Sequence, residues 1–206
     1  MAENEFTISS DAVRLIREQG YEPRRTMDAK IAEWRALYTG TDPFFDVPYV
    51  NAKGRKRKRR RNSLKPARRV CRELASLILT DDTKVSVGAP DANEWLQGYL
   101  ARSNFWPTGQ RVVEGCAALG TAAWALSFDV RDGQVARITL PRYDARMVLP
   151  LTFDSQGVYE CAFVTRVADA GRDAEQVQLM TLDEATGTYH VRTWLLRDGR
   201  ALDPGA

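Results

Sequence analysis

Apolar and polar positions along this chain follow two periods, and the change falls near residue 121. Before that point apolar side chains recur every three or four residues, as on one side of a helix, and after it they alternate with polar side chains, as in strands. The first period predicts five helices, at residues 10–20, 26–40, 63–80, 91–100 and 108–120.

The expected helix starts carry residues that can cap them. Hydroxyl side chains that can accept hydrogen bonds from free backbone amides precede three of the apolar repeats, at Ser10, Thr26 and Ser63. Asp91, followed three residues later by Glu94, has the spacing of a capping box. The first two helices are close together and share an apolar stripe, so residues 1–40 are interpreted as an N-terminal helical hairpin.

The second period predicts an antiparallel sheet. A hairpin is expected with its turn at residues 131–134, and turn-forming clusters separate the strands that follow it. The predicted strands are residues 123–128, 135–140, 147–153, 158–167, 176–182 and 189–196, with one further short strand at 84–87. The fold class is therefore α+β, with a helical N-terminal half followed by an antiparallel β-meander.

Composition fits a globular protein with a sizeable core. The chain has 206 residues, of which 44% are hydrophobic and 28% charged. Its apolar runs are all shorter than the roughly 18 residues needed to span a bilayer, so no membrane partner is expected. Three widely spaced cysteines in apolar surroundings predict buried thiols made in a reducing cytoplasm.

Charge is concentrated in one segment. Residues 41–61 contain two prolines, a glycine and a basic run without a lasting period, so they are predicted to form a long basic loop. The eight basic residues are Lys53, Arg55, Lys56, Arg57, Lys58, Arg59, Arg60 and Arg61. Without these eight of the 30 lysines and arginines, 22 remain against 27 acidic residues. The body of the protein is acidic and its basicity is local.

Two interpretations of the basic run remain open. Eight cations on a loop can neutralise several nucleic-acid phosphates without reading sequence, and such binding weakens steeply with salt. The same run can instead be a solvated loop, or contact an acidic surface on a neighbouring subunit or a capsid shell. Aromatic residues that would stack on bases are absent inside the run.

The sequence offers no catalytic, cofactor or metal site. The phosphate-cradling motif of P-loop ATPases does not occur, and the aspartates fall mostly in predicted turns. His190, the only histidine, alternates within a predicted strand and is interpreted as a partly exposed strand residue. No Cys-x-x-Cys pair provides zinc-ligand spacing. We expect neither enzymatic activity nor a bound cofactor.

An ordered series of short blocks carries a resemblance to a known family. In chain order the blocks are Trp34-Arg35-Ala36-Leu37-Tyr38-Thr39-Gly40, Asn62-Ser63-Leu64-Lys65-Pro66, Arg72-Glu73-Leu74-Ala75-Ser76-Leu77-Ile78, Asn104-Phe105-Trp106, Glu114-Gly115-Cys116-Ala117-Ala118-Leu119-Gly120, Leu140-Pro141-Arg142-Tyr143-Asp144 and Val148-Leu149-Pro150-Leu151. Their order and spacing resemble the N-terminal wing region of tailed-bacteriophage portal proteins, in particular the SPP1 Gp6-like group.

The resemblance implies a structural role in the virion. A portal subunit of this kind, made in the bacterial cytoplasm, joins a homo-oligomeric ring of twelve at one capsid vertex, through which double-stranded DNA is packaged and ejected. The implied partners are that DNA, the terminase motor, capsid or scaffold proteins and head–tail adaptors. Residues 62–206 would be an α+β wing domain that stops before the stem, clip and crown of the family.

One departure from the family pattern keeps a second hypothesis open. Eight basic residues directly before the Asn62 block exceed what the resemblance leads us to expect. The alternative is a free-standing, non-specific nucleic-acid-binding protein that uses the basic loop at residues 53–61, with the rest of the chain as its scaffold.

Overall fold

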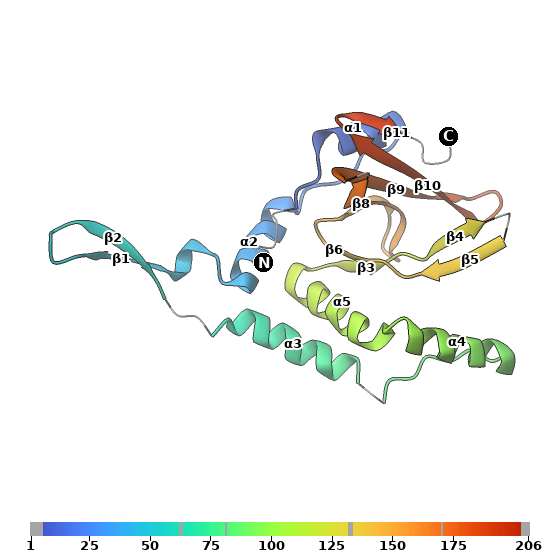
Figure 1. Ribbon diagram of the computed structural model, residues 1–206, viewed down its shortest axis with the longest axis horizontal. Coiled ribbons are helices and arrows are strands. Elements are labelled where there is room, and N and C mark those ends of the chain that lie inside the picture. Colours follow the sequence, from blue (N-terminus) through green and yellow to red (C-terminus); the bar gives the residue numbers. More distant parts are fainter. Residues whose placement is uncertain (1–5, 62–63, 81, 132–133, 170, 203–206) are drawn as a thin grey trace. The chain divides into compact units, whose positions relative to one another are not determined.

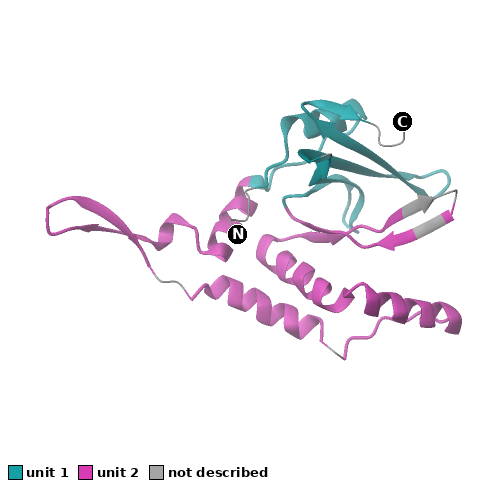
Figure 2. Cartoon of the chain, viewed as in Figure 1, with its two compact units in different colours: residues 1–28, 146–206 teal, residues 29–145 magenta. Residues whose placement is uncertain are grey.

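The fold was analysed in a computed structural model that describes residues 6–61, 64–80, 82–131, 134–169 and 171–202. The chain forms two compact units, shown in separate colours in Figure 2. One unit comprises residues 1–28 and 146–206, and the other comprises residues 29–145. Five helices lie before residue 120 and most strands lie after it, so the predicted α+β class is confirmed.

A five-stranded antiparallel meander makes up most of the first unit (Figure 1). Its strand order is β11-β10-β9-β8-β7, so each strand pairs with its neighbour in sequence. The strands are β7 (Val148–Phe153), β8 (Val158–Asp169), β9 (Arg172–Asp183), β10 (Thr188–Arg197) and β11 (Arg200–Leu202). The predicted meander is confirmed, and β11 is an additional short strand.

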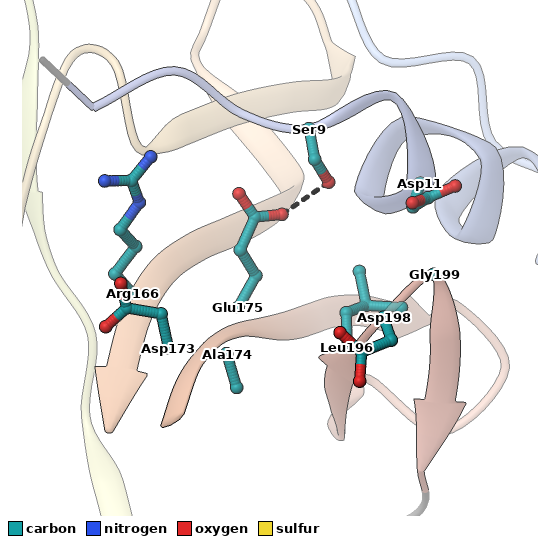
Figure 3. Close-up of a pocket in the computed structure, with 9 residues that line it drawn as sticks. All are labelled: Ser9, Asp11, Arg166, Asp173, Ala174, Glu175, Leu196, Asp198 and Gly199. Carbon is teal, nitrogen blue, oxygen red and sulfur yellow. Dashed lines mark hydrogen bonds between the residues drawn. The ribbon is translucent and has the colours of Figure 1, made fainter. Parts of the chain in front are cut away.

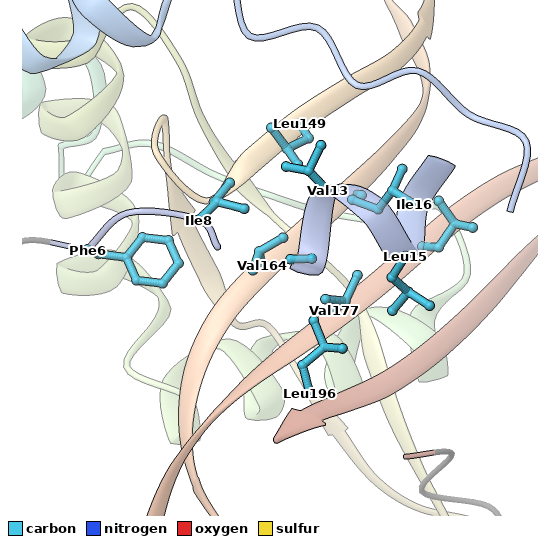
Figure 4. Close-up of a cluster of buried hydrophobic side chains, with 12 residues drawn as sticks. Phe6, Ile8, Val13, Leu15, Ile16, Leu149, Val164, Val177 and Leu196 are labelled. Carbon is cyan, nitrogen blue, oxygen red and sulfur yellow. The ribbon is translucent and has the colours of Figure 1, made fainter. Parts of the chain in front are cut away.

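Helix α1 (Ser10–Glu18) packs on this sheet and supplies its core (Figure 4). Ile16 of the helix is 1% exposed and packs with Val164 of β8 and Val177 of β9, which are fully buried and lie opposite each other in the register. Burial of a large aliphatic side chain contributes about 1.5–3 kcal/mol. The cap is Ser9 instead of the predicted Ser10, because the hydroxyl of Ser9 accepts the Ala12 amide at 3.1 Å.

The second unit contains the remaining four helices. They are α2 (Asp28–Thr39), α3 (Pro66–Ile78), α4 (Pro90–Arg102) and α5 (Phe105–Leu119). Gly20, Gly40 and Gly120 follow helix ends at positive φ, and Pro66 occupies the first turn of α3. The proposed cap Ser63 lies outside the described residues.

Three local predictions for the helical region are wrong. Asp91 lies within the first turn of α4, and that helix begins after Ala89 without a side-chain cap, so there is no capping box. Helix α5 begins at Phe105 instead of residue 108. Residues 84–87 form no strand, because side chains of α4 satisfy their backbone: Gln97 donates to the Val85 carbonyl at 2.7 Å, and Asn93 accepts the Val87 amide at 3.3 Å.

A polar cluster joins three helices of the second unit. The Tyr38 hydroxyl of α2 donates to the Glu114 carboxylate of α5 at 2.5 Å, and the Arg72 guanidinium of α3 donates to the same oxygen at 3.0 Å. The Arg68 guanidinium lies 5.7 Å from the centre of the Tyr38 ring. Burial, followed by the hydrogen bond to Glu114, raises the pKa of Tyr38 to about 12.

Four short strands follow α5 in the second unit. The predicted hairpin forms from β4 (Ser127–Arg131) and β5 (Gln134–Thr139), and its turn lies partly outside the described residues. The predicted first strand is divided, because β3 (Ala122–Trp124) leaves β4 and pairs instead with β6 (Arg142–Asp144).

Candidate nucleic-acid interface

The basic segment is a β-hairpin in the structure, so the long loop predicted for residues 41–61 is wrong for most of its length. After a short 3-10 helix (Pro43–Phe45), strand β1 (Asp46–Val50) pairs antiparallel with β2 (Lys56–Arg60). The hairpin extends away from helices α2 and α3 (Figure 1). Every residue of β2 is exposed. Five of the eight cations therefore lie in a strand, Lys53 lies in the turn, and Arg55 and Arg61 directly flank β2.

The hairpin turn is built by one asparagine and one glycine. The Asn51 side-chain oxygen accepts the amides of Lys53 at 3.1 Å and Arg55 at 3.0 Å, and the Asn51 carbonyl accepts the Gly54 amide at 2.9 Å. Gly54 has φ +73°, a left-handed conformation that side chains rarely adopt. This turn returns the chain so that Lys56 pairs with Val50.

Alternation along β2 sorts the two types of cation onto opposite faces. Successive side chains of a strand point to opposite sides, and residues directly opposite in the register share a side. Arg57 and Arg59, which pair with Tyr49 and Val47, occupy one face. The ladder continues at both ends through Asn51 N to Arg55 O at 3.0 Å and Arg61 N to Phe45 O at 2.8 Å. By the same alternation Arg55 and Arg61 lie on the side of Arg57 and Arg59. We call this side the arginine face; its residues are Arg55, Arg57, Arg59 and Arg61.

Lysines and one bound arginine occupy the opposite side. Lys56 and Lys58, which pair with Val50 and Pro48, form what we call the lysine face. Arg60 shares this side but is already engaged: it donates to the Asp46 carboxylate at 3.0 Å and to the carbonyls of Gly40 at 3.1 Å and Thr41 at 3.2 Å. Among the eight predicted residues, Arg60 is the one that forms an ion pair within the described chain.

Sequence reasoning missed the residues that β1 adds to this surface. Tyr49 is 47% exposed and lies directly across from Arg57 on the arginine face. No aromatic residue interrupts the basic run, but the fold supplies one from the partner strand. The sequence feature that could have predicted this strand is the alternation of arginine and lysine from Arg55 to Arg59, which has the two-residue period of a strand.

The structure also contains two pockets outside the basic hairpin. In the first unit, a pocket of about 170 Å³ lies where α1 begins, and four carboxylates and Arg166 contribute to its lining (Figure 3). The Ser9 hydroxyl donates to the Glu175 carboxylate there at 2.5 Å. The Ser9 hydroxyl is also the cap of α1, where it accepts the Ala12 amide at 3.1 Å, so the Ser9–Glu175 pair has a structural role. In the second unit, a pocket of about 390 Å³ includes Phe105 stacked on Trp124, with ring centroids 5.5 Å apart.

Groups typical of enzymes and metal sites are dispersed. Within the described residues, no set of three or more histidine, cysteine or acidic side chains converges in a way that could bind a metal. His190 is exposed on β10. Cys116 is exposed, contrary to the predicted burial, whereas Cys161 is half-buried and burial raises the pKa of its thiol to about 11. None of the described helices has the length and apolarity that a bilayer crossing requires.

Helix α3 presents an apolar stripe to solvent. Its Ala75 is buried, and the helix contacts α5. Side chains three, four or seven residues apart share one side of a helix, and here they are exposed. The exposed apolar residues, which we call the α3 stripe, are Val70, Leu74, Leu77 and Ile78. Contiguous exposed apolar surface is typical of a protein contact site.

Comparison with known proteins identifies the family. A family profile described as phage portal protein, SPP1 Gp6-like, matches residues 25–193. No curated protein matches the sequence significantly. The matched region includes the basic hairpin, all helices of the second unit and the first three strands of the meander. The match covers well over half of the 206 residues, and the chain therefore belongs to the SPP1 Gp6-like family of phage portal proteins.

Proposed function

We propose that this protein is a structural portal subunit that forms a ring at one capsid vertex, through which double-stranded DNA enters and leaves the head. The family match over residues 25–193 carries this proposal. The α+β architecture agrees with the fold expected for the wing region of this family. In this proposal the subunit performs no covalent chemistry and needs no cofactor.

A ring requires that each subunit meets the next through a surface of its own. In a closed ring this contact joins two different patches of identical chains. We assign the α3 stripe to one side of that contact, with a second copy of the chain as its partner. The support is the ring proposed for the family together with the exposure of Leu77 and Val70, which are 76% and 66% exposed and would lose apolar surface to water on assembly.

The basic hairpin is proposed to bind a polyanion on the portal. Seven of its eight cations form no ion pair within the described chain, so they are available for an external partner. Terminase, capsid or scaffold proteins and head–tail adaptors would dock on other surfaces of the ring. The alternative, a free-standing nucleic-acid-binding protein, rests on the same hairpin but leaves the family match unexplained.

The location of the chain in the virion tests this proposal. An epitope-tagged copy would be supplied during infection by the phage that encodes it, and purified virions would be labelled with gold-conjugated antibody. Label at a single vertex, where the tail joins, is expected. Label spread over the whole capsid, or absent from virions that contain DNA, would overturn the portal assignment.

A further inference from the structure

We infer that the arginine face of the β1–β2 hairpin, and not its lysine face, binds the phosphates of duplex DNA without reading sequence. The inference rests on the proposed portal function and names the ligand and orientation of its basic hairpin. It depends on the hairpin register, which places Arg57 and Arg59 on one side and Lys56 and Lys58 on the other.

The two faces differ in what they can offer a phosphate. A guanidinium presents a planar set of donors that can bind phosphate oxygens in pairs, whereas a lysine ammonium acts as a strongly hydrated point charge. The arginine face carries four guanidinium groups without an ion pair in the described chain. On the other side Arg60 is bound to Asp46, which leaves Lys56 and Lys58.

The dimensions of the ribbon suit a duplex. Alternate residues of a strand lie about 6.8 Å apart, so the four arginines extend over about 20 Å. A duplex has one phosphate of each strand per about 3.4 Å of its axis, so that length contains more phosphates than the face has arginines. Each arginine on the face can therefore find a phosphate at the same time.

The composition of the face argues against other macromolecules. Arginine and tyrosine are common in protein interfaces, but the cores of such interfaces also bury several apolar anchors, and the ladder gives this face Tyr49 and Val47 beside four arginines. Single-stranded nucleic acid is bound by successive aromatic platforms, and the ladder between Val47 and Arg59 supplies one, Tyr49. A regular row of phosphates in a duplex fits best.

Sequence reading by this face would need guanidinium groups held in position. Arginine reads guanine by paired hydrogen bonds to its edge, and no ion pair in the described chain fixes the four guanidinium groups for that contact. Asparagine and glutamine commonly recognise adenine through paired hydrogen bonds. Asn51 is the one such residue on the ladder, and its side-chain oxygen is occupied by the amides of Lys53 and Arg55. Binding should therefore have similar affinity for duplexes of different sequence.

The two faces allow a matched test in the full chain. The variants R57Q/R59Q and K56Q/K58Q each remove two charges from neighbouring positions of the same strand. Binding to a fluorescent 20-base-pair duplex would be followed by anisotropy between 50 and 200 mM salt. If four arginines act together, the slope of log K against log salt is about −3.6 for the wild type, and it falls to about −1.8 for R57Q/R59Q.

The outcomes separate this inference from its alternatives. A loss of affinity of about tenfold or more for R57Q/R59Q, with a slope near the wild-type value for K56Q/K58Q, supports it. Equal losses in both variants, or a wild-type slope near −6, would show that all seven cations act without orientation. Tighter binding of polyglutamate or of single-stranded DNA than of duplex would also overturn the inference. Any of these failures would leave the single-vertex label of the portal proposal unaffected.

Discussion

Arg60 and Asp46 lie opposite each other at the base of the basic hairpin, with the guanidinium Nε 3.0 Å from the carboxylate. The remaining donors of Arg60 reach the carbonyls of Gly40 and Thr41, directly after α2. Arg60 is therefore an anchor for the hairpin, whereas the arginines on the opposite face are free of ion pairs in the described chain. One basic run thus contains two kinds of arginine with different roles.

We expect R60Q to loosen the base of the hairpin without unfolding the protein. Exposed ion pairs contribute at most about 1 kcal/mol, so the thermal midpoint should change little. Hydrogen exchange of the backbone amides in β1 and β2 should increase several-fold relative to the wild type. K58Q, which removes an unpaired charge from the same strand, is the control, and equal exchange in the two variants would show that Arg60 does not anchor the hairpin.

The ion pair between Arg60 and Asp46 should break at acidic pH. The Arg60 guanidinium holds the pKa of Asp46 below its ordinary range. Because the folded-state pKa is lowered, the contact is fully present above the unfolded pKa of about 3.9 and is lost as the pH falls below it. Hairpin amide exchange, corrected for intrinsic rates, should therefore rise below about pH 4 in the wild type. A hairpin that opened at pH 6 would contradict this assignment.

Removal of the Tyr38 hydroxyl should weaken the second unit and change its response to alkali. Y38F loses the hydrogen bond to Glu114, which we expect to cost about 1.5 kcal/mol of unfolding free energy at pH 8. Since the folded-state pKa of Tyr38 is raised to about 12, its contribution is complete below pH 10 and is lost between about pH 10 and 12.

Urea unfolding of wild type and Y38F across this range provides the measurement. The difference between the two proteins should shrink as the pH rises. The exposed Tyr189 offers a control, because Y189F should differ little from the wild type at any pH. A constant difference between wild type and Y38F would show that the hydroxyl does not titrate as described.

Truncation in the sheet core should have the largest effect on stability. I16A removes most of a side chain that is 1% exposed between α1 and the meander, and it should destabilise the protein by about 2–5 kcal/mol. V191A, at a position 51% exposed on β10, should cost less than about 1 kcal/mol. Similar urea midpoints for the two variants would mean that α1 is not packed on the sheet.

A charge on the α3 stripe should affect assembly and leave the subunit folded. L77D changes a residue that is 76% exposed, so unfolding free energy should stay within about 0.5 kcal/mol of the wild type. In a subunit interface the same carboxylate would be buried without a partner, and the oligomer should dissociate. V158D, at an exposed valine of the first unit, is the control. Dissociation by both variants, or by neither, would exclude the α3 stripe as the specific contact.

Element types were predictable from the sequence where one face of an element is buried. Apolar side chains of α1, β8 and β9 are buried in one core. The spacing of apolar residues in the sequence therefore matches the period of each element and predicts its type. Helix starts were less predictable, because Ser9 and Ser10 are both competent caps and only packing selects between them. The strand predicted at residues 84–87 is absent because side chains of α4 form the hydrogen bonds to its backbone that a neighbouring strand would have formed.

The basic hairpin shows why the candidate site was only partly predictable. The run contains no apolar alternation, so its pairing with β1 was not visible, although the arginine–lysine alternation has the same period. The distinction between Arg60 and the other arginines depends on Asp46, Gly40 and Thr41, which the turn at Asn51 brings close. These contacts arise from tertiary structure and leave no local pattern.

The mass of the purified chain in solution tests the portal assignment most directly. Light scattering at low and moderate salt, with and without duplex DNA, distinguishes a ring from a single chain of 23.2 kDa. A closed ring of twelve subunits, about 280 kDa and present without DNA, is the expected result. A 23.2 kDa monomer at every concentration, which gains mass only when DNA is added at low salt, would instead favour the free-standing nucleic-acid-binding protein.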